Sequence, residues 1–281
     1  MRSAPSIPES PTECWSAKLS LRFERQLAKT CMWVGERVGP LSVQRPFYPE
    51  EDVCHAYILH PPGGVVGGDQ LELNVQVEEQ SSALITTPAA NKIYRSNGPE
   101  SRIKQQISVQ SGGTLEWLPQ ETILFGGSSL LADTRINLNP SACFSGWDMT
   151  VLGRPFSGDH YERGVFDQKM TIAVDDKPLL TERHRWRDEE PMLGAAWGMR
   201  GSRVLASIYV YPADADMLTR VQRLVVPSLL DVGVTLLAKL LVVRVLGTAP
   251  QKMRALAERL WTTVRPLQMG RVANRPRIWS T

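Results

Sequence analysis

The stretch Leu71-Glu72-Leu73-Asn74-Val75-Gln76-Val77 alternates apolar and polar side chains without interruption. Successive side chains of a strand point to opposite faces, so its four apolar residues share one face and its three polar residues share the other. A helix would need apolar residues at intervals of three and four, which this stretch lacks. It therefore predicts a strand with one buried face and one solvated face.

The same alternation recurs on both sides of this stretch. Upstream, residues 17–24 again place their apolar side chains on one face. Downstream, short apolar stretches separated by Gly, Pro, Asn and Asp turns predict further strands over residues 83–87, 103–109, 114–118, 136–138, 147–152, 170–174 and 204–211. We therefore expect a mainly β protein. A sandwich, a barrel or a coiled β-solenoid would each bury such strands, and no repeat of fixed length selects the solenoid.

The C-terminal part has a helical period. An amphipathic helix is predicted near residues 250–265, because apolar residues recur there at intervals of three and four and Pro250 suits a first turn. A second helix is predicted near residues 232–246, ended by Gly247, although its Val and Thr residues have low helix propensity. The two helices would cover the β core or offer a groove to a partner. Residues 1–16 are predicted to form a flexible tail, and residues 17–281 a β-rich domain.

Composition argues against several classes of protein. The formal net charge is +3, and the basic residues are scattered among acidic ones, so no nucleic-acid partner is expected. The most apolar stretch, residues 232–246, is too short to span a bilayer and contains Lys239 and Arg244, so no membrane span is expected. The first residues lack the apolar core of a secretory signal, and we expect a cytoplasmic protein.

The residues that usually carry catalysis or bind metals form no recognised pattern. The four cysteines include no C-x-x-C pair, which indicates free thiols in place of a zinc site or a disulfide framework. The four histidines form neither H-x-H nor H-E-x-x-H, so no permanently bound metal or cofactor is expected. No G-x-S-x-G elbow is present, and Cys143 and His160 lack a local signature of nucleophile and base. We therefore predict no catalytic residues.

A glycine-rich segment, His60-Pro61-Pro62-Gly63-Gly64-Val65-Val66-Gly67-Gly68-Asp69, is the most unusual part of the chain. A P-loop would need Gly-Lys-Ser/Thr, and a dinucleotide loop would need G-x-G-x-x-G at the start of a helix, whereas a strand follows here. Nucleotide binding is therefore not expected. A tight connection between strands is the structural alternative. In a later segment, Glu116 and Glu121 stand on either side of Pro119, so Glu121 is predicted to point into a cleft or to lie at an exposed edge.

Six segments together resemble the UreD (UreH) family of urease accessory proteins. The similarity runs from about Leu19 to the C-terminus, and the segments that carry it are, in order, HPPGGVVGGDQLEL, TTPAANKIYRS, EWLPQETILFGG, LGRPFSGD, GVTLLAKLLVVRVLG and RPRIWST. The chain departs from the family twice. Gly126 stands where the family usually has Asp, which removes a carboxylate, and residues 89–92 read Ala-Ala-Asn-Lys where Gly-Ala-Thr-Lys is common.

The resemblance implies a non-catalytic scaffold with a β-helix-like core and a few C-terminal helices. It also implies partners. Proteins that look like UreD bind the helical accessory protein UreF, which recruits the GTPase UreG carrying nickel, and the assembly docks on apo-urease to insert the metal. The lack of a P-loop in this chain agrees with that division of labour, because the nucleotide chemistry would belong to UreG.

The same resemblance leads to a hypothesis about nickel. Carboxylate, carbonyl and water ligands release Ni(II) more easily than thiolates or clustered imidazoles, so a hydrated internal passage would suit a transient ion. Asp69 is the foremost candidate, since the two glycines before it let backbone and ion approach closely, with turn capping as the alternative. The full set of candidate wall residues lies in or beside the family-like segments: His60, Asp69, Thr86, Glu121, Asp148 and Glu182.

Two other classes of function compete with the scaffold. A β-sandwich module that binds a small molecule or a sugar is compatible with the eight tryptophans, and would show a saturable ligand site in the isolated chain. A metal-dependent enzyme with a β-barrel core would show turnover, but the sequence supplies no convergent set of ligands. The scaffold instead predicts an exposed apolar patch that a partner covers.

Overall fold

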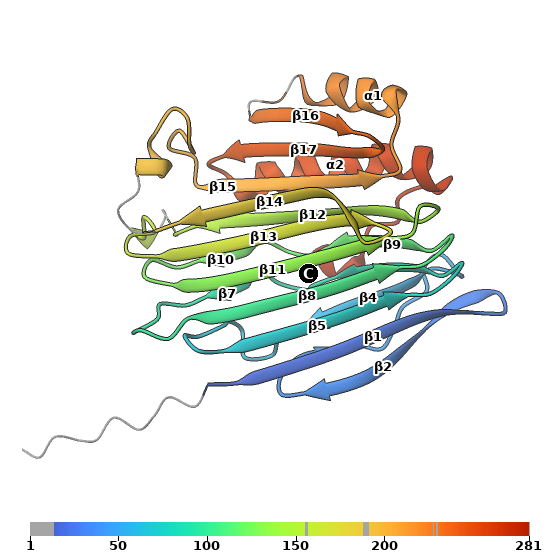
Figure 1. Cartoon of the computed structure of the whole chain (residues 1–281), viewed down its shortest axis with the longest axis horizontal. Helices are drawn as coiled ribbons and strands as arrows, with labels where there is room; N and C mark the ends of the chain where they lie inside the picture. The colour runs from blue at the N-terminus through green and yellow to red at the C-terminus, as the bar shows by residue number, and fades with distance from the viewer. Residues whose placement is uncertain (1–13, 155–156, 188–190, 227, 229, 281) are drawn as a thin grey trace, which may run out of the picture.

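The computed structural model describes residues 14–154, 157–187, 191–226, 228 and 230–280. Within these ranges the chain is mainly β, with two sheets and two α-helices (Figure 1). Residues 1–13 of the predicted tail lie outside the described part, and the first strand, β1, begins at Ser16.

The first sheet contains seven strands in the described ranges. Their order across the sheet is β14 (Lys177–Trp186), β13 (Val165–Val174), β11 (Ser129–Leu138), β8 (Ser101–Val109), β5 (Gln70–Val77), β1 (Ser16–Gln26) and β2 (Lys29–Val38). The second sheet contains ten described strands. Eight follow the order β16 (Asp231–Leu237), β17 (Leu240–Gly247), β15 (Val204–Tyr211), β12 (Cys143–Leu152), β9 (Thr114–Leu118), β6 (Ser82–Thr86), β4 (Cys54–Leu59) and β3 (Ser42–Val43). The short strands β10 (Thr122–Leu124) and β7 (Asn91–Ile93) complete it, with β10 between β12 and β7.

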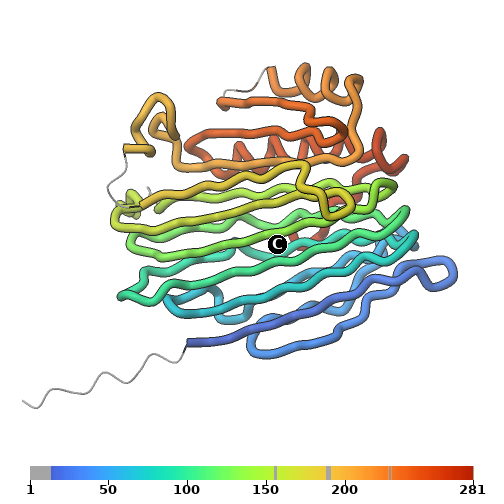
Figure 2. The backbone as a smooth tube through the Cα atoms, viewed as in Figure 1, coloured from blue at the N-terminus to red at the C-terminus, as the bar shows by residue number. Residues whose placement is uncertain are grey.

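The chain winds back and forth between these sheets, so that successive coils stack as in a solenoid (Figure 2). In the first sheet β1, β5, β8, β11 and β13 are parallel neighbours, and in the second β4, β6, β9 and β12 are parallel neighbours. Antiparallel strands end the stack, namely β2 and β14 in the first sheet and β15, β17 and β16 in the second. The β-helix-like fold implied by the resemblance is thereby confirmed.

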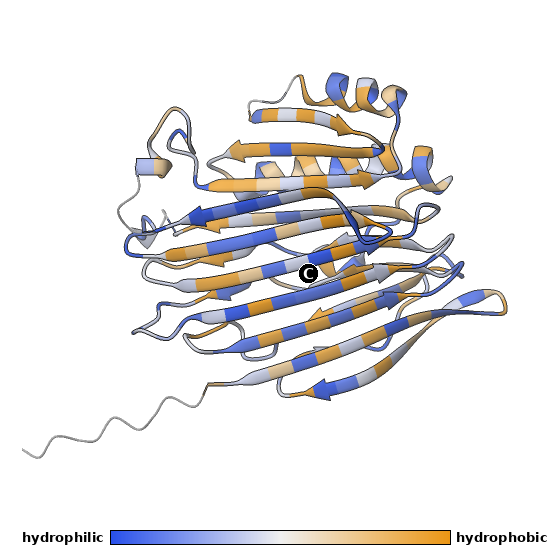
Figure 3. Cartoon of the chain, in the orientation of Figure 1, coloured by the Kyte–Doolittle hydropathy of each residue, from blue (hydrophilic) through white to orange (hydrophobic). Residues whose placement is uncertain are grey.

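A hydrophobic core fills the space between the two sheets. The four apolar residues of the Leu71–Val77 stretch are all buried there, as their alternation predicts. Phe23, Phe144 and Phe166 meet them from other strands and are almost fully buried. Burying such a side chain completely contributes about 1.5–3 kcal/mol. Along the strands of the first sheet, hydrophilic and hydrophobic residues alternate (Figure 3).

The predicted strands are confirmed, since each of the stretches predicted from sequence overlaps an observed strand. Several strands were not predicted, among them β2, β4 and β14. One predicted element is wrong. Residues 232–246 form the hairpin of β16 and β17, which turns at Ala238, where φ is 52°. The apolar stretch of β17 is continuous because both faces of this strand are buried, and that pattern cannot be told from a buried helix by period alone.

Both α-helices lie near the C-terminal end of the second sheet. Helix α1 (Ala215–Val225) was not predicted, and the side chain of Asp214 caps it by accepting a hydrogen bond from the Met217 N–H. The helix predicted near residues 250–265 is confirmed as α2 (Pro250–Met269), which ends at Gly270 with φ 65°. None of the described helices is long and apolar enough to cross a membrane. Two short 3-10 helices, Pro191–Leu193 and Arg277–Ser280, complete the described helical segments.

Helix α2 packs on the outer face of the second sheet, where a second hydrophobic cluster joins it to β12, β15 and β17 (Figure 1). A buried ion pair anchors it there. The Arg265 guanidinium is 0% exposed and donates from Nε and Nη2 to the two carboxylate oxygens of Glu116 on β9, at 2.8 and 2.9 Å. Helix α2 therefore covers the β core from the outer face of the second sheet. An internal site can form in the space between the two sheets.

Candidate functional site

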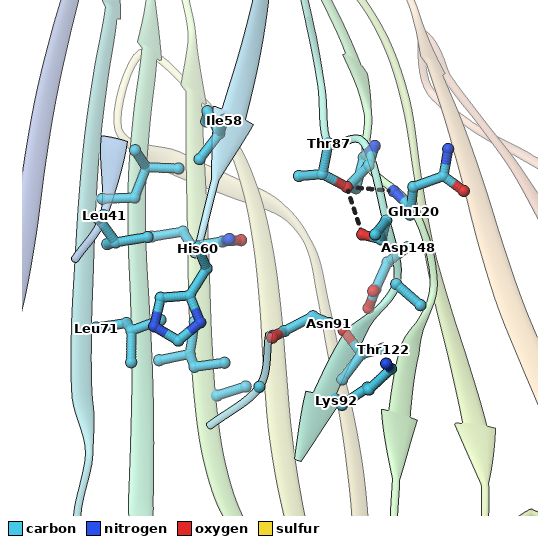
Figure 4. Close-up of a pocket in the computed structure, with 18 of the residues that line it drawn as sticks. Leu41, Ile58, His60, Leu71, Thr87, Asn91, Lys92, Gln120, Thr122 and Asp148 are labelled. Atoms are coloured by element: carbon cyan, nitrogen blue, oxygen red, sulfur yellow. Dashed lines mark hydrogen bonds between the residues drawn. The ribbon is translucent and has the colours of Figure 1, made fainter. Parts of the chain in front are cut away.

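A cavity of about 290 Å³ lies between the two sheets. Most of its wall is apolar, with residues such as Leu41, Ile58 and Leu71 on one side. Figure 4 shows His60 beside these residues, and Asp148 and Gln120 across the cavity from them. The polar side chains that line the cavity include His60, Gln105, Thr134, Asp148 and Gln168.

The glycine-rich segment forms one wall of this cavity through Pro61, Gly63 and Gly64. Val65 pairs with the strand β7, because its N–H donates to the Lys92 carbonyl at 2.7 Å. A Cβ at Gly64 would collide with the ring of Tyr94 and would lie 2.8 Å from the Lys92 carbonyl oxygen. Glycine is therefore required for close packing of two segments, and the segment is a tight connection that also shapes the cavity.

His60 projects into the cavity from the end of β4. Its side chain is half-buried, and no group in the described part of the chain hydrogen-bonds to its buried Nδ1. Burial lowers the pKa of His60, against the nearby charge of Asp69, which raises it. The imidazole is thus held neutral and can offer a nitrogen lone pair to a cation.

Asp69 is buried in the turn that precedes β5. Its Oδ1 accepts from the Trp15 N–H at 3.1 Å, and its Oδ2 accepts from the Val66 N–H at 3.0 Å. The carboxylate therefore caps the turn and also ties down the residues before β1. This geometry corresponds to the turn-capping alternative, and a role for Asp69 toward nickel stays a prediction.

Thr86 and Glu121 lie on the other side of the second sheet. Thr86 Oγ1 donates to the Leu118 carbonyl at 2.6 Å and accepts from Trp279 Nε1 at 2.9 Å. Glu121 forms an ion pair with Arg254 of α2 at 2.6 Å. Their neighbours Thr87 and Gln120 line the cavity instead. Adjacent residues of extended chain point to opposite faces, so a shift of one residue moves a side chain out of the cavity.

Asp148 and Glu182 do come together, in a group of side chains from five strands that we call the inner polar cluster. Gln168 Nε2 donates a hydrogen bond to Asp148 Oδ2, and Gln168 Oε1 lies 3.4 Å from His184 Nδ1. Tyr209 donates its hydroxyl hydrogen to Glu182 Oε2 at 2.6 Å, while Arg244 Nε donates to Glu182 Oε1. The cluster consists of Asp148, Gln168, Glu182, His184, Tyr209 and Arg244.

The charges of the inner polar cluster are set by burial and by these bonds. Burial, with the charge of Glu182, raises the pKa of Asp148 to about 6, although the Gln168 hydrogen bond opposes this. Burial also acts to raise the pKa of Glu182, but hydrogen bonds from Tyr209 and Arg244 outweigh it and lower that pKa. Burial lowers the pKa of His184. Near neutral pH, Glu182 is therefore ionised and paired, and Asp148 can release a proton to receive a cation.

A row of polar side chains lies across the inner face of the first sheet, and Gln105, Thr134 and Gln168 of this row line the cavity. Thr134 Oγ1 donates to Gln105 Oε1 at 3.0 Å, joining β11 to β8. The next strands in the sheet carry Gln168 on β13 and His184 on β14. The row thus crosses four neighbouring strands in the direction in which the coils stack.

Sequence reasoning missed Gln105, Thr134, Gln168, Tyr209 and Arg244. A signal for three of them exists. Gln105 lies between Ile103 and Ile107 in the apolar phase of its strand, and Gln168 lies likewise between Phe166 and Met170. A polar residue at an apolar position of an alternating strand indicates a polar group inside the core. Thr134 stands between Ala132 and Ile136 in the same way.

These side chains can interact with a cation but do not form a cage for it. In the described ranges, no three side chains of His, Cys, Asp or Glu are grouped so that they could hold a metal ion. Carboxylate, amide and hydroxyl oxygens bind late transition-metal ions such as Ni(II) less tightly than thiolates do. Burial raises the pKa of the Cys54 thiol to about 12, and it raises the pKa of Cys143 as well, so neither thiol is ionised at neutral pH.

Gly126, one of the two departures from the family pattern, has a carboxylate beside it. The Gly126 N–H donates to both oxygens of Asp159, at 3.1 and 3.0 Å. Asp159 also accepts from the Tyr161 N–H and from Arg154 Nε. A Cβ at Gly126 would lie 2.6 Å from Asp159 Oδ1, so this carboxylate occupies the space that a side chain at residue 126 would need.

Comparison with known proteins gives a consistent answer. The model of the UreD urease accessory protein family matches residues 16–280. The urease accessory protein UreD of Pseudomonas putida (strain W619) is 42% identical over 267 residues, which cover 95% of each chain. The UreD protein of Alkalilimnicola ehrlichii is 44% identical over 284 residues, covering 99% of this chain and 95% of its own. That of Alcanivorax borkumensis is 41% identical over 273 residues, covering 95% and 92%.

Proposed function

The chain belongs to the UreD family of urease accessory proteins and has a role in urease maturation, and from this premise we propose that it is a non-catalytic scaffold with an internal nickel passage. As a scaffold it binds UreF directly, is joined to the GTPase UreG through UreF, and docks the assembly on apo-urease. As a passage it conducts nickel past the inner polar cluster to the urease active site.

The row of polar side chains inside an otherwise apolar core is the observation that carries the passage. A buried polar group costs free energy unless it is hydrogen-bonded, and a buried acid costs more. The raised pKa of Asp148 expresses that cost directly. An apolar side chain at residue 105, 134 or 168 would complete the core at lower cost. An ion that passes along these polar side chains explains why they are present in the core despite this cost.

The chemistry of the row also suits an ion in transit. Nickel bound by thiolates or by several imidazoles would be held strongly, whereas amide, hydroxyl and carboxylate oxygens with water let it leave. His60 contributes a single imidazole at the end of the cavity, beside the glycine-rich segment. From His60, which directly follows β4, to Asp148 on β12 the ion crosses three strand spacings, or roughly 14 Å.

Exposed apolar side chains support the scaffold. Trp33, Val34 and Val38 lie on β2, an edge strand of the first sheet, and each is nearly half exposed. Trp197 is 72% exposed. Large apolar side chains at an unpaired sheet edge favour association, so partner proteins that cover such surfaces would stabilise the chain in solution.

The decisive experiment copurifies the tagged chain with UreF, UreG and apo-urease and then measures nickel in urease by atomic absorption, with and without the chain. Without the chain, urease should stay free of nickel. The passage is tested by Asp148→Ala, with Asp133→Ala as the matched control, because Asp133 is exposed on the outer face of β11. The first substitution should lower the nickel content severalfold and leave capture of UreF intact.

The outcomes separate the two parts of the proposal. Normal loading by the Asp148→Ala variant would remove the passage but keep the scaffold. If no assembly forms around the wild-type chain, and urease acquires nickel without it, the scaffold itself is refuted.

A further inference from the structure

The end of the polar row is closed by an ion pair between the two sheets. Glu182 lies on β14, the last strand of the first sheet, and Arg244 lies on β17 of the second sheet. The Arg244 Nε atom donates to Glu182 Oε1 across the gap. The Glu182 side chain is only 9% exposed, whereas the Arg244 side chain is 44% exposed. The pair therefore stands where the interior meets solvent.

Neither oxygen of Glu182 is available to a cation in this arrangement. Tyr209 donates to Oε2 at 2.6 Å, and Arg244 holds Oε1. The positive charge of the Arg244 guanidinium acts on both Glu182 and His184, lowering the pKa of each. A cation that approaches Glu182 thus meets a charge-balanced carboxylate and a positive charge that repels it.

We propose that Arg244 is the closing residue of the passage: it holds Glu182 while the passage is empty, and an arriving nickel ion displaces it and takes Glu182 as its next ligand. This inference rests on the proposed nickel passage. It assigns to Arg244 a positioning role, since the residue acts through Glu182 and does not bind the ion.

The unequal exposure of the two partners decides which one moves. Arg244 already reaches solvent and can be hydrated when it leaves, so its release is easy. Glu182 is enclosed and cannot remain ionised without a positive partner, so a cation must replace the guanidinium. Burial and the charge of Glu182 raise the pKa of Tyr209 well above its usual value, which keeps this hydroxyl neutral and bonded to Glu182 throughout.

The same strand supplies a matched control. Arg183 is adjacent to Glu182, but it points to the outer face of β14 and pairs with Asp167 at 2.6 Å. Replacing Arg183 with Gln removes an ion pair from the same strand without touching the polar row. Replacing Arg244 with Gln removes the closing charge, and Arg244→Lys retains the charge.

The test measures escape of nickel from the assembled complex. The full chain is copurified with UreF and UreG, loaded with Ni²⁺, and mixed with a colorimetric nickel chelator, and the rate of colour formation is recorded. Arg244→Gln should release nickel roughly fivefold faster, the ratio that corresponds to the approximately 1 kcal/mol of a partly exposed ion pair. Arg183→Gln should match wild type, and Arg244→Lys should restore most of the slow release.

The outcomes distinguish the closing role of Arg244 from the nickel passage on which it rests. If Arg244→Gln releases nickel at the wild-type rate while Asp148→Asn abolishes uptake, the closing role is overturned and the passage stands. If Asp148→Asn takes up nickel normally, the passage itself is lost. If Arg244→Gln fails to assemble, the Arg244→Lys variant provides the test, because it keeps the positive charge. It must release nickel more slowly than the roughly fivefold faster rate expected for loss of the charge. Release at that rate or above it contradicts the closing role.

Discussion

Gln168 and Asp148 face each other from different sheets, and the Gln168 amide donates a hydrogen bond to the Asp148 carboxylate across the core. A neutral donor of this kind supports a buried acid without cancelling its charge. Asp148 is therefore ionisable near neutral pH, unlike Glu182, whose charge Arg244 already balances. The contrast between the two acids leads to the first two predictions.

Asp148→Asn should stabilise the fold at high pH. The pKa of Asp148 is about 6 in the folded chain against 3.8 for the free side chain, so the native state binds the proton more tightly. Its unfavourable contribution is absent below about pH 4 and complete above about pH 6, where it amounts to at most about 3 kcal/mol. Urea unfolding at pH 4.5 and 7.5 should show the variant gaining clearly more stability over wild type at the higher pH. An equal difference at both pH values would contradict this.

Nickel loading of urease should depend on the same group. A cation must displace the proton from Asp148, so loading should fall as the pH is lowered through about 6. Gln168→Leu removes the hydrogen bond that holds this pKa down, and the midpoint should therefore move to higher pH. The measurement is the initial rate of urease activation from pH 5.5 to 8. Gln106→Leu, on the outer face of β8, serves as the control and should leave the midpoint unchanged.

Gly64→Ala should destabilise the chain. The new methyl group would collide with Tyr94 and with the Lys92 carbonyl oxygen, which lies 2.8 Å from the Cβ position. Overpacking of this kind costs about 1–3 kcal/mol. Gly194→Ala is the comparison, because no atom lies within 4 Å of a Cβ there and its backbone is not in the left-handed region. Thermal unfolding should separate the two variants, and equal melting temperatures would refute the close-packing argument.

Glu116→Gln should weaken the attachment of helix α2. Arg265 is fully buried, and its guanidinium would lose the charge of one of its two carboxylate partners. Removing one partner of a buried pair costs about 3–5 kcal/mol, an upper bound here because Glu50 also pairs with Arg265. Arg200→Gln breaks an exposed pair with Asp231 and should change stability little. Limited proteolysis and denaturant unfolding measure the stability of both variants. Similar losses of stability for Glu116→Gln and Arg200→Gln would contradict the role of the buried ion pair.

Gly126→Asp should be unfavourable in this chain although the family usually has Asp there. The added Cβ would lie 2.6 Å from Asp159 Oδ1, and a second carboxylate would sit beside the first. Crowding and like-charge repulsion should cost about 2 kcal/mol. Adding Asp159→Gly should recover most of the loss, which denaturant unfolding can measure. No recovery in the double variant would show that the two positions do not substitute for each other.

The sequence by itself determined many of the strands and the family. Strict alternation in the Leu71–Val77 stretch predicted its buried face, since a period of two has no helical counterpart. The helical period near residues 250–265 likewise predicted α2, and six ordered segments indicated the UreD family. These features are local, so short-range pattern was sufficient to find them.

Only the tertiary structure decided which residues form the candidate site. Asp148, Gln168, Glu182, Tyr209 and Arg244 come from five strands, and their meeting depends on how the coils stack. Alternation shows which side chains of one strand share a face, but not which face turns inward when both sides of a sheet are covered. For that reason Thr86 and Glu121 are predicted in the passage whereas their neighbours line the cavity. The strand β17, whose first four residues are buried on both faces, likewise resembles part of a helix in sequence.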